Sequence, residues 1–113
     1  MTLTIYHNPR CGTSRKTLAL LQERGLKPRV IPYLDTPLKA DEIKALLKKL
    51  GLTAHELLRR KEAPALGLDP AAMSEAQLIA AMVKHPILIE RPVVVNGAKA
   101  AIGRPPESVL SIL

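Results

Sequence analysis

The sequence predicts an α/β fold in which a β-α-β unit and a β-β-α unit share one mixed four-stranded sheet, with a helical insertion between them. Three observations lead to this prediction. Two β-rich runs flank a helical pattern in the first third of the chain. Apolar residues recur at helical spacing through the middle. The last quarter holds two β-rich runs around an Asn-Gly turn, followed by a proline-rich helix start.

The first third of the chain is the predicted β-α-β unit. Leu3–Tyr6 is a short β-rich run, and a helical pattern covers Ser14–Arg24. Gly25 is a good stop, because glycine tolerates the left-handed conformation at a helix end. Arg29–Ile31 then reads as a second strand. Strands joined by a helical crossover are expected to run parallel.

The helical insertion is expected over about residues 39–85. Its first helix covers Asp41–Leu50, with apolar residues on one face, and is closed by Gly51. Ala63-Pro64 and Leu68–Pro70 are expected to be loops.

Two further helices of the insertion carry capping-box spacing, in which a hydroxyl and a carboxylate or amide three positions later satisfy each other's backbone N–H groups. The boxes are Thr53 with Glu56, and Ser74 with Gln77. The second of these helices is expected to end at His85-Pro86, because a residue before proline avoids the α region.

The last quarter is the predicted β-β-α unit. Val93–Val95 is a run of β-branched residues that suggests burial on both faces. Asn96-Gly97 favours a two-residue hairpin turn, and Lys99–Ile102 returns as the fourth strand. Arg104–Glu107 opens a short final helix, with proline in its first turn. This order of elements is that of a thioredoxin-like fold, in a single domain over residues 1–113.

Composition limits the possible partners. The net charge of +7, from 17 Lys and Arg against 10 Asp and Glu, attracts anions in general. No nucleic-acid partner is expected, because only Tyr6 and Tyr33 are available for base stacking. No membrane is expected either, since no apolar run approaches the ~20 residues that span a bilayer. One cysteine and a start unlike a signal peptide indicate a reduced, cytoplasmic protein.

The only cysteine, Cys11, lies in the stretch HNPRCGTSRK, directly before the first predicted helix. N–H groups and the dipole at a helix start favour an anion there, and His7 and Arg15 lie close in sequence. A lone cysteine is often a small buried apolar residue, but this polar turn is a poor place for core packing. We therefore expect a reactive thiolate.

Spacing excludes several cysteine chemistries. Position 14 is serine, so no Cys-x-x-Cys disulfide can form, and Thr17 stands where a thiol phosphatase loop needs arginine. No metal site is expected, because one cysteine and three scattered histidines lack ligand spacing. What remains is a thiolate that binds or attacks an anion and is regenerated by an outside thiol.

An anion site needs permanent cations, and arginine supplies its donors in a planar fork. Arg59, Arg91 and Arg104 lie where the predicted chain can return toward the thiol, although spacing alone does not single them out from other arginines. Ser14 is expected as a helix N-cap or a first-turn donor, and Arg15 as a contact near the sulfur.

The stretch IYHNPRCGTSRKTL resembles the opening of the glutaredoxin-coupled arsenate reductase family, which is ArsC-type and thioredoxin-like. The likeness covers essentially the whole chain: YLDTP at 33–37, ELLRRKE at 56–62, HPILIERPVVV at 85–95 and IGRPPESVLSIL at 102–113. HNPxCGTSR and HPILIxRPxVV are specific in combination.

The resemblance implies roles for particular residues. Cys11 would be the nucleophile, and His7 would help to tune it. The arginines of the LLR, RP-V-V and GRP blocks map to Arg59, Arg91 and Arg104, which would bind the oxyanion. A cis peptide bond before the proline of the RP-V-V block is also implied.

The resemblance further implies the reaction and its partners. Cys11 would attack arsenate to form a thioarsenate ester, glutathione would add as co-substrate, and glutaredoxin would reduce the adduct so that arsenite leaves. No bound cofactor is expected. Because the resolving thiols come from outside, this scheme fits a chain with one cysteine.

Two other functions stay open. Spx-type regulators share this fold and bind RNA polymerase, although many carry the Cys-x-x-Cys switch that this chain lacks. A glutathione-dependent thiol reductase acting on a different substrate would use the same thiolate and arginines, because a fold and a nucleophile do not fix the substrate.

Overall fold

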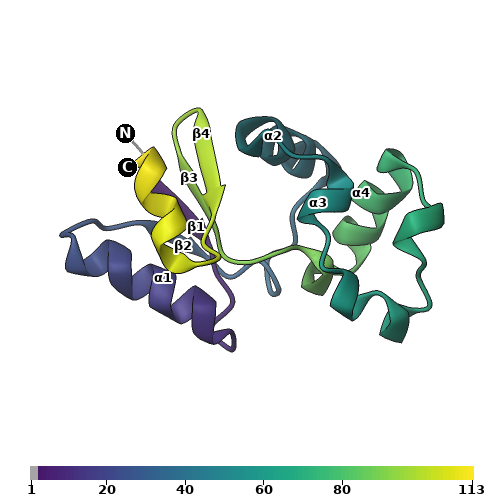
Figure 1. The fold of residues 1–113 in the computed structure, drawn as a ribbon, viewed down its shortest axis with the longest axis horizontal. Coiled ribbons are helices and arrows are strands. Elements are labelled where there is room, and N and C mark those ends of the chain that lie inside the picture. The colour runs from purple at the N-terminus through teal and green to yellow at the C-terminus, as the bar shows by residue number, and fades with distance from the viewer. Residues whose placement is uncertain (1–2) are drawn as a thin grey trace. The chain divides into compact units, whose positions relative to one another are not determined.

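The computed structural model describes residues 3–113, which form two compact units. The first unit joins the residues up to Thr36 with Arg91–Leu113, and the second is Pro37–Glu90. The helices expected in the insertion lie in the second unit (Figure 1). The interpretation of the chain as one domain stays a prediction.

The first unit contains the predicted mixed four-stranded sheet, in the order β2-β1-β3-β4. Its strands are β1 (Leu3–Tyr6), β2 (Arg29–Ile31), β3 (Val93–Asn96) and β4 (Lys99–Ile102). β1 pairs parallel with β2, whereas β1 with β3 and β3 with β4 are antiparallel. The three valines that begin β3 are buried, as their β-branched run predicted. The fold is therefore thioredoxin-like, with β1 and β3 at the centre of the sheet.

Two helices of the first unit, α1 (Gly12–Glu23) and η5 (Pro106–Ile112), pack side by side and contribute to one core with the sheet (Figure 1). This core contains Ile5 and Val94 from the sheet, Leu21 from α1, and Val109 and Ile112 from η5. The final helix was predicted, and it is a 3₁₀ helix with Pro106 at its start. Its contact with α1 places the chain after β4 beside the first helix.

The β3–β4 hairpin turns one residue later than the Asn96-Gly97 motif predicted. Asn96 pairs with Lys99 at the end of the ladder, so Gly97 and Ala98 form the turn. Gly97 has a φ of 62°, and no non-glycine residue among those described has a positive φ. This pattern fits a type II′ turn, which needs glycine at its first central position. Asn96 instead belongs to the strand, and its Nδ2 donates to the Ile112 carbonyl at 2.6 Å.

The second unit is helical, as expected. It contains α2 (Ala40–Leu50), α3 (Ala54–Leu57) and α4 (Glu75–Lys84). Both predicted capping boxes are present, at the starts of α3 and α4. His85 ends α4 directly before Pro86, as predicted. These helix boundaries could be predicted from the sequence because each depends on only a few neighbouring residues.

The two segments expected to be loops are loop except at their last residues, Pro64 and Pro70, which begin the short 3₁₀ helices η2 (Pro64–Leu66) and η3 (Pro70–Ala72). Two more 3₁₀ helices that were not predicted, η1 (Arg60–Glu62) and η4 (Pro86–Leu88), precede η2 and follow α4. A proline begins three of them, because its fixed φ suits a first helical position and its missing N–H is not needed there. Single 3₁₀ turns carry too few residues to give a periodic signal.

Candidate active site

Cys11 is the N-cap of α1, with φ −93° and ψ 121°. Its carbonyl accepts the N–H of Arg15 at 3.0 Å, and its own N–H donates to the Asn8 carbonyl at 3.0 Å. The side-chain oxygen of Asn8 also accepts a hydrogen bond from the N–H of Arg10 at 3.0 Å, which stabilises the turn before the helix. The sulfur thus stands at the positive end of the helix. The helix begins two residues before the predicted Ser14, so Cys11 is its N-cap and Ser14 lies in the first turn, the other position expected for it.

Two of the three predicted arginines lie at the sulfur. Arg104 Nη2 is 3.6 Å from Cys11 Sγ, and Arg104 Nε donates to the Arg91 carbonyl at 2.8 Å. The buried Arg91 side chain also hydrogen-bonds to the thiolate form of Cys11. The Arg91–Pro92 peptide bond is cis, as the resemblance implied, and Arg104–Pro105 is cis as well. The structure therefore brings Cys11, Arg91 and Arg104 together.

The surroundings lower the pKa of the Cys11 thiol. Burial is the largest single influence and acts in the opposite direction, since it raises the pKa by disfavouring the thiolate. Four groups together outweigh it: the N–H of Ser14, the guanidinium of Arg91, the N–H of Thr13 and the charge of Arg104. The site therefore favours the thiolate, which is the nucleophilic form of cysteine.

A buried polar pair lies beneath this turn. Ser14 Oγ and His7 Nδ1 are 2.6 Å apart, and Ser14 Oγ also accepts the N–H of Asn8 at 3.0 Å. Ser14 is 0% exposed and His7 is 7% exposed. Burial, and secondly the charge of Arg15, lower the pKa of His7, which favours a neutral imidazole. The backbone N–H of Ser14 thus stabilises the thiolate. The Ser14 hydroxyl hydrogen-bonds to the His7 ring and to the N–H of Asn8.

Arg15 contacts the turn that precedes the helix. Its Nη1 donates to the Pro9 carbonyl at 2.8 Å, and the side chain is exposed. Through its charge it also contributes to the lowered pKa of His7. Its expected contribution to substrate binding stays a prediction, as does that of Ser14.

Arg59 belongs to the second unit, where its backbone is fixed to the segment after α4. Its N–H donates to the Leu88 carbonyl at 2.6 Å, and the neighbouring Leu58 pairs with Ile89 in an isolated antiparallel bridge. Arg59 Nε lies 3.8 Å from Glu90 Oε1. The role in oxyanion binding that the resemblance assigns to Arg59 stays a prediction.

Thr17 and Gly103 support the site and were missed by sequence analysis. A Cβ atom on Gly103 would lie 2.6 Å from Thr17 Oγ1 and 2.8 Å from Pro92 Cγ. Thr17 is buried, with its Oγ1 2.9 Å from the Thr13 carbonyl and 3.4 Å from the Gly103 carbonyl. α1 therefore lies directly against the residue that precedes Arg104. No signal in a single sequence marks a contact between positions 86 residues apart.

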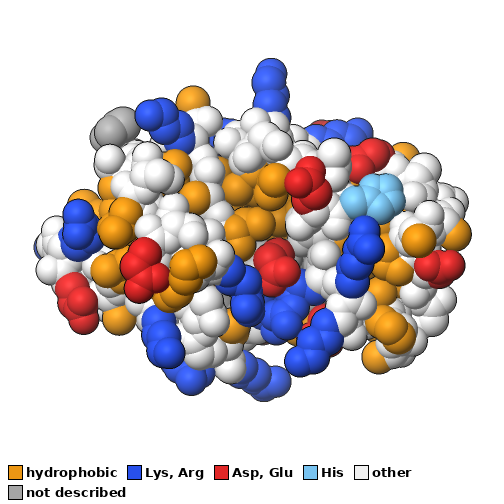
Figure 2. All heavy atoms as spheres, viewed as in Figure 1, with side chains coloured by type: hydrophobic (Ala, Val, Ile, Leu, Met, Phe, Trp, Pro, Cys, Tyr) orange, Lys and Arg blue, Asp and Glu red, His pale blue; other side chains and the backbone are white. Residues whose placement is uncertain are grey.

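Within residues 3–113, no group of three or more His, Cys, Asp or Glu residues is placed to hold a metal ion. None of the helices in the same range is long and apolar enough to span a membrane. Figure 2 shows Lys and Arg side chains scattered over the displayed face, with Asp and Glu among them.

The fold and site define a thioredoxin-like protein whose one cysteine, with a lowered pKa, lies at the N-terminus of a helix beside two arginines. Residues 6–112 match the ArsC family, and the chain belongs to it. It is 54% identical over 112 residues to an Escherichia coli relative named uncharacterized protein YfgD, covering 96% of this chain and 94% of the relative. It is 46% identical over 116 residues to an arsenate reductase of Haemophilus influenzae, covering 100% of both chains. A solved arsenate reductase from Vibrio cholerae is 47% identical with a TM-score of 0.91, covering 100% of this chain and 98% of that one.

Proposed function

We propose that this protein is an arsenate reductase in which the Cys11 thiolate attacks the arsenic of arsenate. The observation that carries the proposal is the approach of Arg104 Nη2 to within 3.6 Å of Cys11 Sγ at a helix N-terminus. Arg91 and Arg104 would neutralise the oxyanion and the charge that develops on it, since donors fixed in advance stabilise such charge best. The names of the relatives support arsenate as the substrate.

The proposed reaction needs thiols from outside the chain. Attack by Cys11 forms an S–As bond, and one arsenate oxygen leaves as water. Reduction of As(V) to As(III) takes two electrons, and a chain with one cysteine cannot supply them by forming an internal disulfide. Glutathione would therefore form a second S–As bond, with another arsenate oxygen leaving as water, and a glutaredoxin thiol would take the glutathione sulfur as a mixed disulfide, leaving its two bonding electrons on arsenic as As(III). Water then releases arsenite, and Cys11 returns as a thiol.

The remaining predicted residues have supporting roles in this proposal. His7 would act on the thiol through Ser14, whose hydroxyl it contacts at 2.6 Å. Arg15 would secure the turn through the Pro9 carbonyl. Arg59 would bind the oxyanion, as the resemblance implies. Because glutathione and glutaredoxin act in reducing compartments, the proposal places the reaction in the cytoplasm.

A coupled assay tests the proposal. The purified protein is mixed with arsenate, glutathione, glutaredoxin, glutathione reductase and NADPH, and arsenate-dependent NADPH oxidation is followed. Turnover is expected for the wild type and none for Cys11→Ser. If Cys11 forms a glutathione adduct but arsenate causes no NADPH oxidation, the result favours a thiol reductase with another substrate.

A further inference from the structure

The buried hydroxyl of Thr17 takes no part in the proposed reaction. Thr17 is 0% exposed, although threonine side chains mostly lie at the surface. Its Oγ1 lies 2.9 Å from the Thr13 carbonyl and 3.4 Å from the Gly103 carbonyl. The first contact is the usual bond of a helical threonine to the carbonyl four residues earlier. The second leaves the helix, and the single proton of the hydroxyl serves both carbonyls.

Both carbonyls belong to segments that stabilise the Cys11 thiolate. Thr13 lies in the first turn of α1, and its N–H is one of the groups that lower the pKa of the thiol. Gly103 directly precedes Arg104, whose Nη2 lies 3.6 Å from the sulfur. Thr17 therefore joins the helix that begins at the nucleophile to the residue before the arginine that stabilises it.

The backbone around Arg104 is held from two directions. The N–H of Gly103 donates to the Pro92 carbonyl at 2.9 Å, and the N–H of Arg104 donates to the Ile102 carbonyl at 2.9 Å. These two bonds hold the segment beside the β3–β4 hairpin. The Gly103 carbonyl is bound instead from α1, by Thr17 Oγ1. Thr17 therefore helps to set how close the segment with Arg104 comes to the helix.

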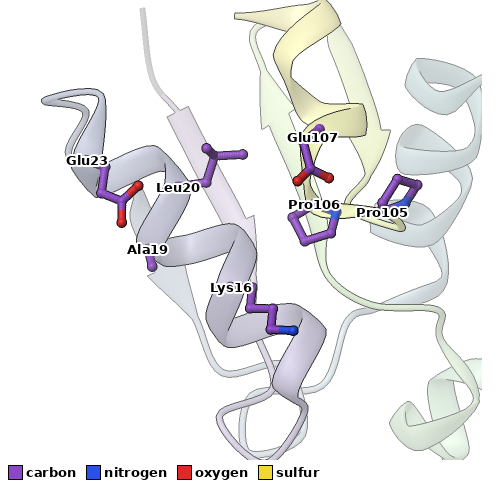
Figure 3. A pocket seen from close by; sticks show the side chains of 7 residues that line it. All are labelled: Lys16, Ala19, Leu20, Glu23, Pro105, Pro106 and Glu107. Atoms are coloured by element: carbon purple, nitrogen blue, oxygen red, sulfur yellow. The ribbon is translucent and has the colours of Figure 1, made fainter.

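After Arg104, a groove of about 480 Å³ separates the chain from α1. Residues of its two walls include Lys16, Leu20, Pro105 and Pro106 (Figure 3). On the other side of Arg104 the approach is close, because a Cβ on Gly103 would lie 2.6 Å from Thr17 Oγ1. The segment thus meets the helix at Gly103, and the position of Arg104 depends on the contact made there.

We propose that Thr17 is a positioning residue whose hydroxyl holds Arg104 in place beside the Cys11 sulfur. It acts through the Gly103 carbonyl, one residue from Arg104. Without the hydroxyl this carbonyl loses a buried donor, and the segment is expected to move toward another donor or water. Arg104 would then stabilise the thiolate less, because its charge acts from a greater distance. The effect on arsenate turnover rests on the proposed function, whereas the effect on the sulfur does not.

Variants of Thr17 separate the hydroxyl from the packing of the side chain. Thr17→Val keeps the branched shape without the hydroxyl and is expected to raise the pKa of Cys11 toward its ordinary value. Thr17→Ser keeps the hydroxyl and is expected to retain the wild-type pKa, although the lost methyl group lowers its stability to urea. Thr17→Ala differs from Thr17→Ser by the hydroxyl alone and gives the same comparison if Thr17→Val does not fold. The pKa is measured from the pH dependence of alkylation.

Ser111→Ala is the matched control, because Ser111 Oγ donates to the Ser108 carbonyl of its own helix at 3.1 Å and lies at an exposed position. It is expected to leave the pKa of Cys11 unchanged. In the coupled assay, Thr17→Val is expected to lower kcat/KM for arsenate by about two-fold or more, as for the loss of a neutral hydrogen bond. Thr17→Ser is expected to keep the wild-type kcat/KM.

A double variant tests whether Thr17 acts through Arg104. In the Arg104→Gln background, Thr17→Val is expected to raise the pKa of Cys11 no further, because the charge that it positions is already absent. An additive rise in the double variant would overturn the proposal. So would an unchanged pKa in Thr17→Val, or equal rises in Thr17→Val and Thr17→Ser, which would assign the effect to packing. If the wild type does not turn over arsenate, the proposed function fails, while the pKa measurements, which need no substrate, still decide the role of Thr17.

Discussion

The charge of the Cys11 sulfur depends on opposing influences from a few residues. Burial disfavours the thiolate, whereas two backbone N–H groups and two arginines favour it. Arg91 lies shortly before β3 and Arg104 shortly after β4, far from Cys11 in the sequence. The thiolate therefore depends on the folded chain. Removing one arginine should therefore shift the balance without removing the nucleophile.

Arg104→Gln is expected to raise the pKa of Cys11 toward its ordinary value, because the charge 3.6 Å from the sulfur is lost. The pKa is measured from the ultraviolet absorbance of the thiolate and from the pH dependence of alkylation. Arg10→Gln is the matched control, since Arg10 lies in the same turn but is not among the groups that stabilise the thiolate. An unchanged pKa in Arg104→Gln would contradict the proposed role of this guanidinium.

His7 is expected to make the stability of the folded protein decrease at acidic pH. Burial, and then the charge of Arg15, lower its pKa in the folded state, so the unfolded chain takes up the proton at a higher pH. The stability that neutral His7 contributes is therefore complete above a pH of about 6.5 and is lost as the pH falls through the folded-state pKa. We expect the free energy of unfolding of His7→Gln to decrease less steeply than that of the wild type as the pH falls below about 6.5.

Urea unfolding at a series of pH values measures this dependence. His85→Gln, which removes a histidine from the second unit, is the control for the general effect of losing an imidazole. Parallel curves for wild type and His7→Gln between pH 6.5 and acid unfolding would rule out His7 as the source, given its ordinary pKa of about 6.5.

Among the elements, α1 and the end of β4 approach closely at Gly103. The nearest atoms to a new Cβ there would be Thr17 Oγ1 at 2.6 Å and Pro92 Cγ at 2.8 Å. Glycine at this position therefore allows α1, the residue before Arg104 and the start of β3 to meet. The contact fixes the distance between the helix that carries Cys11 and the strand that leads to Arg104.

Gly103→Ala is expected to destabilise the protein by about 1–3 kcal/mol through overpacking. Gly12→Ala is the control, because a Cβ there would meet only Arg15 Nη2, at an ordinary 3.7 Å. Urea denaturation measures both changes. Adding Thr17→Ala to Gly103→Ala should restore part of the loss, since it removes the closest clash. Equal stability of Gly103→Ala and wild type would show that the elements can separate at little cost.

The elements that sequence analysis predicted correctly are those with local signals. The strands, the capping boxes of α3 and α4 and the position of Cys11 at the start of α1 each follow from adjacent residues. The hairpin turn moved by one residue because pairing across the sheet places Asn96 in the strand. The Gly103 contact could not be predicted, because it depends on tertiary packing between distant segments. Arg91 and Arg104 were selected by family resemblance rather than by spacing.

At the scale of the whole molecule, the net charge of +7 favours anionic substrates in general but does not select one. Selection has to come from arginines held in fixed positions, which supply directional hydrogen bonds as well as charge. Arg91 and Arg104 belong to the first unit, and Arg59 belongs to the second. The activity of an Arg59 variant therefore tests whether the proposed reaction needs residues of both units.

Arg59→Gln is expected to lower kcat/KM for arsenate by about ten-fold or more, because a charged hydrogen bond contributes about 1.5–3 kcal/mol. Arg60→Gln removes the same charge from the adjacent, exposed position and should change kcat/KM little. This comparison separates a specific contact with the oxyanion from the general attraction of a basic protein, which both variants weaken equally. Because Arg59 Nε lies 3.8 Å from Glu90, urea unfolding of both variants must show that the second unit remains folded. If the two variants lose activity to the same small extent, Arg59 acts through net charge alone, and the arginines of the first unit would carry arsenate binding.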